Sequence, residues 1–230
     1  MLNINTHRTL LIQILKEIYS DSSLGPILGF KGGTAAYLFY ELGRFSVDLD
    51  FDLLDEKKED FILEKIEKIL INFGTIKEKY NKRHTIFFVI SYSKEAHNIK
   101  VEINKRSFGS SYEVRNYLGI SMLVMKKEDM FAHKLAALLD RKKIANRDIF
   151  DIWFFLKNNW DVNEGIIEKR TGLKLNEYLK ECISLLEKES DRYILQGIGE
   201  LLDEKTKVWA KQKLKKDIIF LLKLKLEEIK

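Results

Sequence analysis

Residues 28–54 read LGFKGGTAAYLFYELGRFSVDLDFDLL and carry the most informative pattern in the chain. A short apolar run leads into the Gly32-Gly33 pair. The residues from Ala35 to Leu42 are typical of a helix, which we expect to end at the next glycine. From Ser46 to Leu53 apolar and acidic residues alternate strictly, and this alternation predicts a strand. The stretch therefore predicts a strand, a glycine turn, a helix and a second strand in this order.

The alternation separates two kinds of side chain, because successive residues of a strand point to opposite faces. Apolar residues share the face expected in the core, namely Val47, Leu49, Phe51 and Leu53, and carboxylates share the other, namely Asp48, Asp50 and Asp52. Carboxylates crowded on one face repel each other. Divalent cations such as Mg²⁺ offset this repulsion, and two ions about 4 Å apart can clamp an in-line displacement at phosphorus.

The glycines before the helix suit an anion site. Gly32 and Gly33 permit close backbone approach and a positive φ, and exposed N–H groups at the start of a helix bind phosphate. We expect Lys31, Gly32, Gly33 and Thr34 to bind a triphosphate next to cations held by the carboxylates. The alternative is a surface hairpin with a glycine turn and an acidic face turned to solvent.

At these residues the chain resembles the polymerase-beta-type nucleotidyltransferases, whose signature is a Gly-Gly or Gly-Ser turn, a helix and Asp-x-Asp on a strand. The sequence motif KGGTA … RFSVDLDF is similar to the corresponding motif of the AbiEii/AbiGii toxin branch of that superfamily. The broader superfamily often has Ser where this chain has Gly33, which leaves Thr34 as the nearby hydroxyl.

The resemblance implies an enzyme that transfers a nucleoside monophosphate from an NTP to an acceptor hydroxyl and releases pyrophosphate. Two Mg²⁺ ions would be held by Asp48 and Asp50. The acceptor would be tRNA or another RNA, and a cognate antitoxin protein would restrain the toxin. Two alternatives stay open: an antibiotic-type enzyme with a small acceptor, and a non-catalytic RNA- or protein-binding module on the same fold.

The composition is that of a globular protein of 230 residues with a net charge of +5. No apolar run approaches the ~20 residues of a membrane span, and the N-terminal segment lacks the form of a signal peptide. Cys182 is the single cysteine, which rules out an intramolecular disulfide and a cysteine metal cluster. We therefore expect a cytoplasmic protein. The positive charge permits a polyanionic partner such as RNA without requiring one.

We expect an α+β fold, with a polymerase-beta-like mixed sheet and helices over residues 1–127 and an all-helical part over 128–230 that completes the active-site cleft. The predicted helices are 5–20 and 56–73, with Asp55 as the N-cap of the second, and the predicted strands are 75–80, 85–92, 99–104 and 120–125. Residues 106–116 are expected to be a loop with a short strand. Trp209 and the apolar residues of 214–226 are expected in the core.

A third carboxylate is expected from the predicted strand 99–104, where Lys100, Glu102 and Asn104 alternate with apolar residues. Glu102 matches the position at which the superfamily places a further acid, and Lys100-x-Glu102 resembles the Lys-x-Glu pattern of the toxin branch. It would serve as a metal ligand or as the base for the attacking hydroxyl. The alternative is an exposed glutamate paired with a neighbouring lysine.

The helical part offers further candidates. Lys134 shares a helix face with apolar neighbours, where a lysine rarely lies without a partner. We interpret it as a catalytic and nucleotide-binding cation, against the alternative of a lysine snorkelling past the apolar stripe. Asp148 is a catalytic candidate and Asp151 a nucleotide-binding one, because the toxin branch carries Arg-Asp-x-x-Asp, although both would also suit a helix N-terminus.

Three further residues are candidates. Arg44 and Arg147 could hold phosphate oxygens or be ordinary surface arginines. Ser46 precedes the acidic strand, as in the family wording, and could orient Asp48 or simply begin the strand. His133, which is adjacent to Lys134, is interpreted as structural.

Overall fold

The computed structural model describes residues 2–93, 97–141 and 143–229. Its contacts divide the chain into two compact units. The sheet unit consists of Met1–Glu41, Phe45–Ser107 and Ser111–Met125, and the helical unit consists of Leu42–Arg44, Phe108–Ser110 and Lys126–Lys230. No helix of the described residues is long and apolar enough to cross a membrane.

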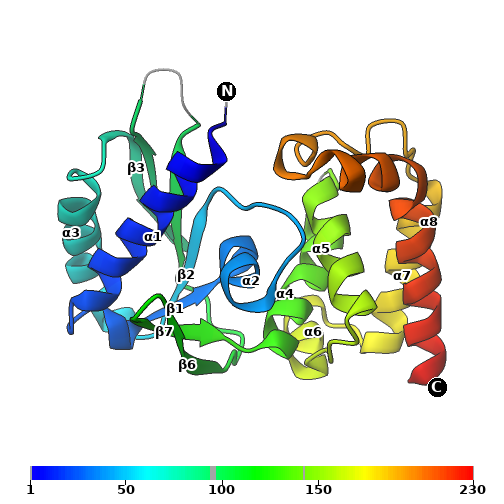
Figure 1. The fold of residues 1–230 in the computed structure, drawn as a ribbon. Coiled ribbons are helices and arrows are strands. Elements are labelled where there is room, and N and C mark those ends of the chain that lie inside the picture. The colour runs from blue at the N-terminus through cyan, green and yellow to red at the C-terminus, as the bar shows by residue number, and fades with distance from the viewer. Residues whose placement is uncertain (1, 94–96, 142, 230) are drawn as a thin grey trace. The chain divides into compact units, whose positions relative to one another are not determined.

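The described part of the sheet unit contains a seven-stranded mixed sheet (Figure 1). Its helices are α1 (Ile4–Ser20), α2 (Gly32–Tyr40) and α3 (Glu59–Leu70), and its strands are β1 (Leu28–Lys31), β2 (Leu49–Leu53), β3 (Thr75–Lys82), β4 (Thr85–Ser91), β5 (Ile99–Asn104), β6 (Tyr112–Tyr117) and β7 (Ile120–Met125). The strand order is β3-β4-β5-β2-β1-β7-β6. The pairs β2–β5 and β1–β7 are parallel, and the other neighbours are antiparallel.

One face of this sheet forms the core, as the alternation predicts. Leu49 and Phe51 of β2 are fully buried. The ring of Phe51 lies 5.4 Å from that of Phe30 on β1 and 6.4 Å from that of Tyr19 on α1, and Phe30 in turn contacts Phe39 of α2. Helices α1 and α2 therefore pack on the face opposite to the carboxylates, and α3 contacts α1 (Figure 1).

The described part of the helical unit consists of helices and short turns. The α-helices are α4 (Lys127–Asp140), α5 (Asn146–Lys157), α6 (Glu164–Thr171), α7 (Leu175–Lys188) and α8 (Glu204–Glu228). Aromatic rings join them: Phe155 of α5 stacks on Trp160 with 4.1 Å between ring centroids, and Trp153 lies 4.1 Å from Trp209 of α8.

The α+β class and the predicted segments 5–20, 75–80, 85–92, 99–104 and 120–125 are confirmed, with boundaries that shift by a few residues. Other details differ. Helix α2 starts at Gly32 and ends at Tyr40, because Glu41 adopts a left-handed conformation with φ of 57°. Asp55 caps a short 3₁₀ turn, Glu56–Lys58, ahead of α3.

The loop with a short strand that was expected over residues 106–116 is present in outline, and the strand is β6, residues 112–117, paired with β7. The expectation about the packing of α8 is wrong in part. On α8, Leu214, Ile218 and Leu222 are buried, but Phe220 and Leu224 are exposed because they lie off that stripe. Trp209 is only half-buried.

His7 of α1 fixes the segment that leads to the acidic strand. It is fully buried, its Nε2 lies 2.9 Å from the Val47 carbonyl oxygen, and its Nδ1 lies 2.9 Å from the Tyr92 hydroxyl. A carbonyl only accepts, so Nε2 carries the proton and Nδ1 accepts from the tyrosine. Burial lowers the pKa of His7, and the bond to Val47 and the charge of Asp48 oppose that effect only in part.

This lowered pKa predicts acid sensitivity of the sheet unit. The unfolded histidine takes up its proton near pH 6.5, whereas the folded one does so at lower pH. The contribution is therefore fully present above pH 6.5 and is lost as the pH falls below it. We expect unfolding midpoints followed by far-UV circular dichroism to decrease from pH 7.5 to pH 5 more steeply in the wild type than in His7→Gln. An equal slope in both proteins would contradict the assignment.

Candidate active site

The turn between β1 and α2 brings glycine backbone against a carboxylate. Gly32 has φ of 80°, and a Cβ atom built on it would lie 2.2 Å from Asp50 Oδ2 and 2.9 Å from Asp50 Cβ. Both the conformation and the space therefore require glycine here. The next residue, Gly33, is buried in the first turn of α2.

Thr34 ties this turn to the residue that precedes β2. Its side chain is buried, and its hydroxyl donates a hydrogen bond to the backbone carbonyl oxygen of Asp48. The threonine thereby fixes the backbone that carries the first acidic side chain. Ser46 is also buried, two residues before Asp48.

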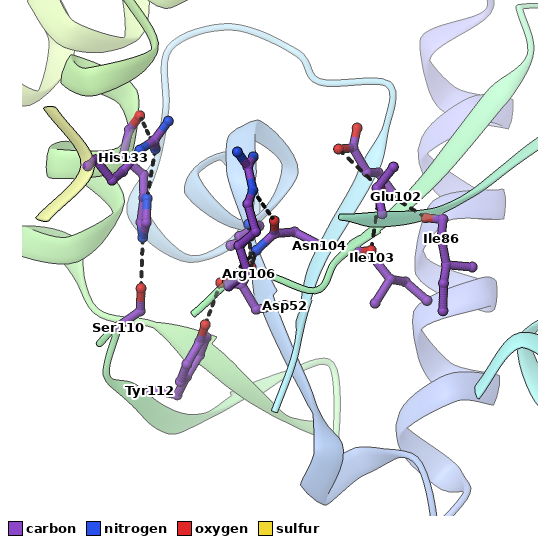
Figure 2. Close-up of polar contacts among 12 residues, drawn as sticks. Asp52, Ile86, Glu102, Ile103, Asn104, Arg106, Ser110, Tyr112 and His133 are labelled. Carbon is purple, nitrogen blue, oxygen red and sulfur yellow. Dashed lines mark hydrogen bonds and ion pairs between the residues drawn. The ribbon is translucent and has the colours of Figure 1, made fainter. Parts of the chain in front are cut away.

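The carboxylates of two strands meet on the open face of the sheet. Asp50 of β2 is in register with Glu102 of β5 in a parallel pair, and residues in register on neighbouring strands project to the same face. Asp48 immediately precedes β2 and is half-buried, like Asp50, whereas Glu102 is exposed. The Glu102 carboxylate lies 3.5 Å from the Thr85 hydroxyl of β4 (Figure 2). Among the described residues no three acidic, histidine or cysteine side chains already converge tightly enough to hold a metal ion.

Asp52 has a different role from its two acidic neighbours. This buried carboxylate accepts hydrogen bonds from three other strands (Figure 2). Lys31 Nζ lies 2.5 Å from Oδ1, Asn104 Nδ2 lies 2.6 Å from the same oxygen, and the Tyr112 hydroxyl lies 2.5 Å from Oδ2. The Lys31 ammonium is thereby held beside the Gly32 turn, since Lys31 is also in register with Asp50.

The sequence pattern does not indicate the hydrogen-bond partners of Asp52. It only places this residue on the acidic face of the strand. The hydroxyl of Tyr112 reaches Asp52 across Gly29, where a Cβ would lie 2.2 Å from the Tyr112 ring. Asn104 lies on the polar face of β5 in the sequence pattern. Its contact with Asp52 follows from the register of β2 and β5, which the sequence alone does not give.

The helical unit contains a second charged cluster, in which two carboxylates of α5 face three cations. Lys134 Nζ of α4 lies 2.7 Å from Asp148 Oδ1 and 3.1 Å from Asp151 Oδ2. Arg44 holds Asp151 with two bonds, of 2.6 Å and 2.7 Å, and Arg141 Nε lies 3.1 Å from Asp148 Oδ2. Both carboxylates are completely buried. Lys134, Asp148 and Asp151 thus lie together in this unit, as the three-residue spacing of the aspartates on one helix allows.

The charges in this cluster hold each other ionised. Burial works against the charged form of Lys134, but the charges of Asp148 and Asp151 outweigh it and raise the pKa of Lys134. Burial likewise works against the Asp148 carboxylate, and Lys134 and Arg141 outweigh it and lower the pKa of Asp148. Asp148 is not an N-cap, because α5 is preceded by Ala145 without a side-chain cap.

The remaining candidates lie elsewhere in the helical unit. Arg147 is half-buried in the first turn of α5. His133 Nδ1 accepts from Arg170, 2.9 Å away, so its Nε2 carries the proton and donates to Ser110 Oγ at 2.7 Å (Figure 2). These bonds fit the structural role expected for His133.

The Arg44–Asp151 pair predicts a large loss of stability when one partner is removed. In Asp151→Ala a guanidinium whose side chain is only 2% exposed would lose its bidentate carboxylate. Breaking a buried pair in this way costs about 3–5 kcal/mol. We expect this loss in guanidinium unfolding followed by tryptophan fluorescence, since Trp153, Trp160 and Trp209 all lie in the helical unit.

Two further variants test whether the uncompensated charge of Arg44 causes the loss of stability in Asp151→Ala. Asp161→Ala removes an exposed aspartate of the same unit and should change stability little. The double variant Arg44→Met, Asp151→Leu replaces the pair by apolar side chains and should recover much of the loss. A double variant as unstable as Asp151→Ala would show that packing, and not the uncompensated charge, causes the effect.

Comparisons with known proteins identify the family and the fold. The model of the nucleotidyl transferase AbiEii toxins, from type IV toxin–antitoxin systems, matches residues 13–212. A crystal structure of a candidate nucleotidyltransferase from H. pylori is 24% identical with a TM-score of 0.65, covering 98% of this chain and 97% of the other. JHP933 from Helicobacter pylori is 23% identical with a TM-score of 0.58, covering 100% and 98%.

The two solved structures show the fold alone at these identities, and no curated protein matches the chain. The family match carries the assignment, because it extends over the glycine turn, the acidic strands and most of the helical unit. Membership implies an NTP substrate and an antitoxin partner. The chain belongs to the AbiEii family of toxin nucleotidyltransferases.

Proposed function

We propose that this nucleotidyltransferase is Mg²⁺-dependent and transfers a nucleoside monophosphate from an NTP to a hydroxyl of an RNA acceptor, with tRNA as the first candidate. The observation that carries the proposal is the row formed by Lys31, Asp50 and Glu102, which are in register on three adjacent strands beside the Gly32 turn. A cation, two carboxylates and a glycine backbone are the groups that an NTP and its metal ions need.

The donor set fits divalent cations. Asp48, Asp50 and Glu102 offer carboxylate oxygens, the ligands that Mg²⁺ prefers. Asp52 is excluded from this role, since three protein donors already occupy its two oxygens. Glu102 is exposed, so its side chain has the rotamer freedom to turn toward a bound ion. When bound, the ions would neutralise phosphate charge and stabilise the departing pyrophosphate.

The residues of the sheet unit would then have separate roles in NTP binding and catalysis. The Gly32-Gly33 backbone would approach the phosphates, Lys31 would offset their charge, and Thr34, with Ser46 nearby, would hold the Asp48 segment in place. In the reaction, the acceptor oxygen bonds to the α-phosphorus, the bond from that phosphorus to the bridging oxygen breaks, and pyrophosphate leaves. Glu102 is the candidate base that takes the hydroxyl proton.

For the helical unit the proposal rests on the family resemblance. It assigns Lys134, Asp148 and Asp151 to nucleotide binding or catalysis. Their ion network supports this in one respect, because it keeps Lys134 charged. Arg44 does not serve phosphate binding in this proposal, since Asp151 holds its guanidinium in a buried bidentate pair.

The positive net charge of +5 is compatible with an RNA acceptor and does not by itself decide between RNA and a small molecule. The experiment is incubation of the purified protein with each of the four α-labelled NTPs, Mg²⁺ and total RNA, with label followed into RNA and into small molecules. We expect label in RNA and its loss when EDTA replaces Mg²⁺. Label in small molecules alone would support the antibiotic-type alternative, and no label in any fraction would support the non-catalytic module.

Removing the acidic groups should abolish transfer without unfolding the protein. We expect Asp48→Ala, Asp50→Ala and Glu102→Gln to reduce incorporation to the level of a reaction without enzyme, because each removes a proposed ligand of the cations. Glu64→Gln, at an exposed position of α3, is the matched control and should be fully active. Full incorporation by the Asp50 variant would refute the proposed site.

Gly32→Ala tests the turn itself. The new Cβ would collide with the Asp50 carboxylate, and displacing a reacting group by about 1 Å can reduce the rate about a hundredfold. Gly119→Ala is the matched control, because Gly119 has nearly the same φ of 82° but has nothing within 4 Å of the added Cβ. Both variants carry backbone strain, so a selective loss of incorporation in Gly32→Ala isolates the contact with Asp50.

A further inference from the structure

The row that contains the carboxylates continues onto two strands that have no assigned role. Glu102 of β5 is in register with Phe87 of β4, and Phe87 is in register with Tyr80 of β3. Side chains in register share a face. The open face therefore carries Lys31, Asp50, Glu102, Phe87 and Tyr80 in this order across five adjacent strands.

Tyr80 and Phe87, the aromatic pair, form a stack at the end of this row. Their ring centroids are 4.7 Å apart and their planes differ by only 19°. Both side chains are half-buried, on the face opposite to the one where α1 and α2 pack. The aromatic pair is therefore not part of the core beneath the helices, where burial alone would account for two large rings.

Cations and the neighbouring carboxylate complete the surroundings of the aromatic pair. Lys82 Nζ lies 4.3 Å from the centre of the Tyr80 ring, on the same strand. Lys77, Lys82 and Arg83 are all exposed on this hairpin, and they give it the charge that a phosphate backbone would meet. Burial raises the pKa of Tyr80, and so do the charges of Glu102 and Glu78.

We propose that the aromatic pair is a stacking platform for a base of the RNA acceptor, next to the hydroxyl that attacks the transferred phosphorus. The inference rests on the proposed function and adds where the acceptor binds. Stacked aromatic rings flanked by lysine are the chemistry by which proteins hold single-stranded bases without reading their sequence.

The order of the row decides between the acceptor and the NTP. In an in-line displacement the attacking and the leaving oxygens lie on opposite sides of the phosphorus. The glycine turn and Lys31, proposed to hold the triphosphate, lie on one side of the carboxylates, and the aromatic pair lies on the other. The leaving pyrophosphate belongs at the Lys31 end, so the acceptor belongs at the aromatic end.

The distances suit a terminal nucleotide. Neighbouring strands are about 4.8 Å apart, so Phe87 is about 5 Å from Glu102 and about 10 Å from Asp50 along the sheet. One face of the Phe87 ring stacks on Tyr80, and Lys82 lies over the Tyr80 ring. The base would therefore stack on the other face of Phe87, on the side of Glu102. A nucleotide stacked there would have its ribose hydroxyl near Glu102, the candidate base.

The test measures RNA binding without NTP or metal, so that it does not depend on catalysis. The probe is a fluorescein-labelled single-stranded RNA, and the readout is fluorescence anisotropy with the full chain. We expect Phe87→Leu, which keeps the apolar bulk but removes the ring, to raise the Kd about tenfold, as expected for one lost base stack. Phe87→Tyr should bind like the wild type, because the ring remains.

The control is Tyr193→Leu. Tyr193 is also an aromatic ring with a cation over it, Arg192 at 5.3 Å, but it is 61% exposed and lies in the helical unit. Its loss should leave the Kd unchanged. A second test changes the RNA instead of the protein, by using the same RNA with an abasic terminal nucleotide. The wild type should bind this RNA about tenfold more weakly than the intact RNA. Phe87→Leu should bind the two RNAs with equal affinity.

Each outcome decides the proposal. A Kd of Phe87→Leu within twofold of the wild type, or equal affinity for intact and abasic RNA, overturns it. A raised KM for the NTP with unchanged RNA affinity also overturns it, since the ring would then hold the base of the NTP. Failure of the proposed function looks different: RNA binding would depend on Phe87 as expected, but no label would reach the RNA.

Discussion

The parallel pairing of β2 with β5 is the constraint on which the site depends. Leu49, Phe51, Val101 and Ile103 are completely buried on the core face of these two strands. Because side chains alternate with a period of two, a slip of one residue would turn these apolar groups to solvent and the carboxylates into the core. The hydrophobic face therefore fixes the register, and the register places Glu102 beside Asp50. The energy that aligns the acids comes from the apolar residues between them.

Three aspartates on one strand face are tolerated because they are in different surroundings. Asp52 is neutralised by donors from β1, β5 and β6, so its charge is compensated within the folded chain. Its pairing with Lys31 also fixes an ammonium in the row beside Asp50, which reduces the repulsion along β2. The protein thus separates a structural carboxylate from two that are candidates for cation binding, using only the register of neighbouring strands.

The local pattern predicted much of this, and the partners across the sheet account for the rest. Alternation is a property of one strand, so it was sufficient to assign Asp48, Asp50 and Glu102 to one kind of face. The donors to Asp52 come from residues 21, 52 and 60 positions away in the chain, and no spacing within β2 indicates them. The contact of β6 with β1 was not predicted for the same reason, since Tyr112 packs over Gly29 of β1.

The charged cluster of the helical unit contains contacts that the local pattern of the sequence did not indicate. Arg44 was a candidate for phosphate binding, but its partner Asp151 is 107 residues away. A guanidinium that is buried in a bidentate pair would have to leave an equally buried carboxylate uncompensated before it could bind a phosphate, and that cost exceeds what one phosphate contact returns. Lys134 is in a different position. Two carboxylates share it, its side chain is 17% exposed, and Asp151 keeps Arg44 if the lysine moves. Arg44 and Lys134 are the two cations of this cluster that the sequence analysis named as candidates. Of these two, Lys134 can change partner without leaving Asp151 unpaired.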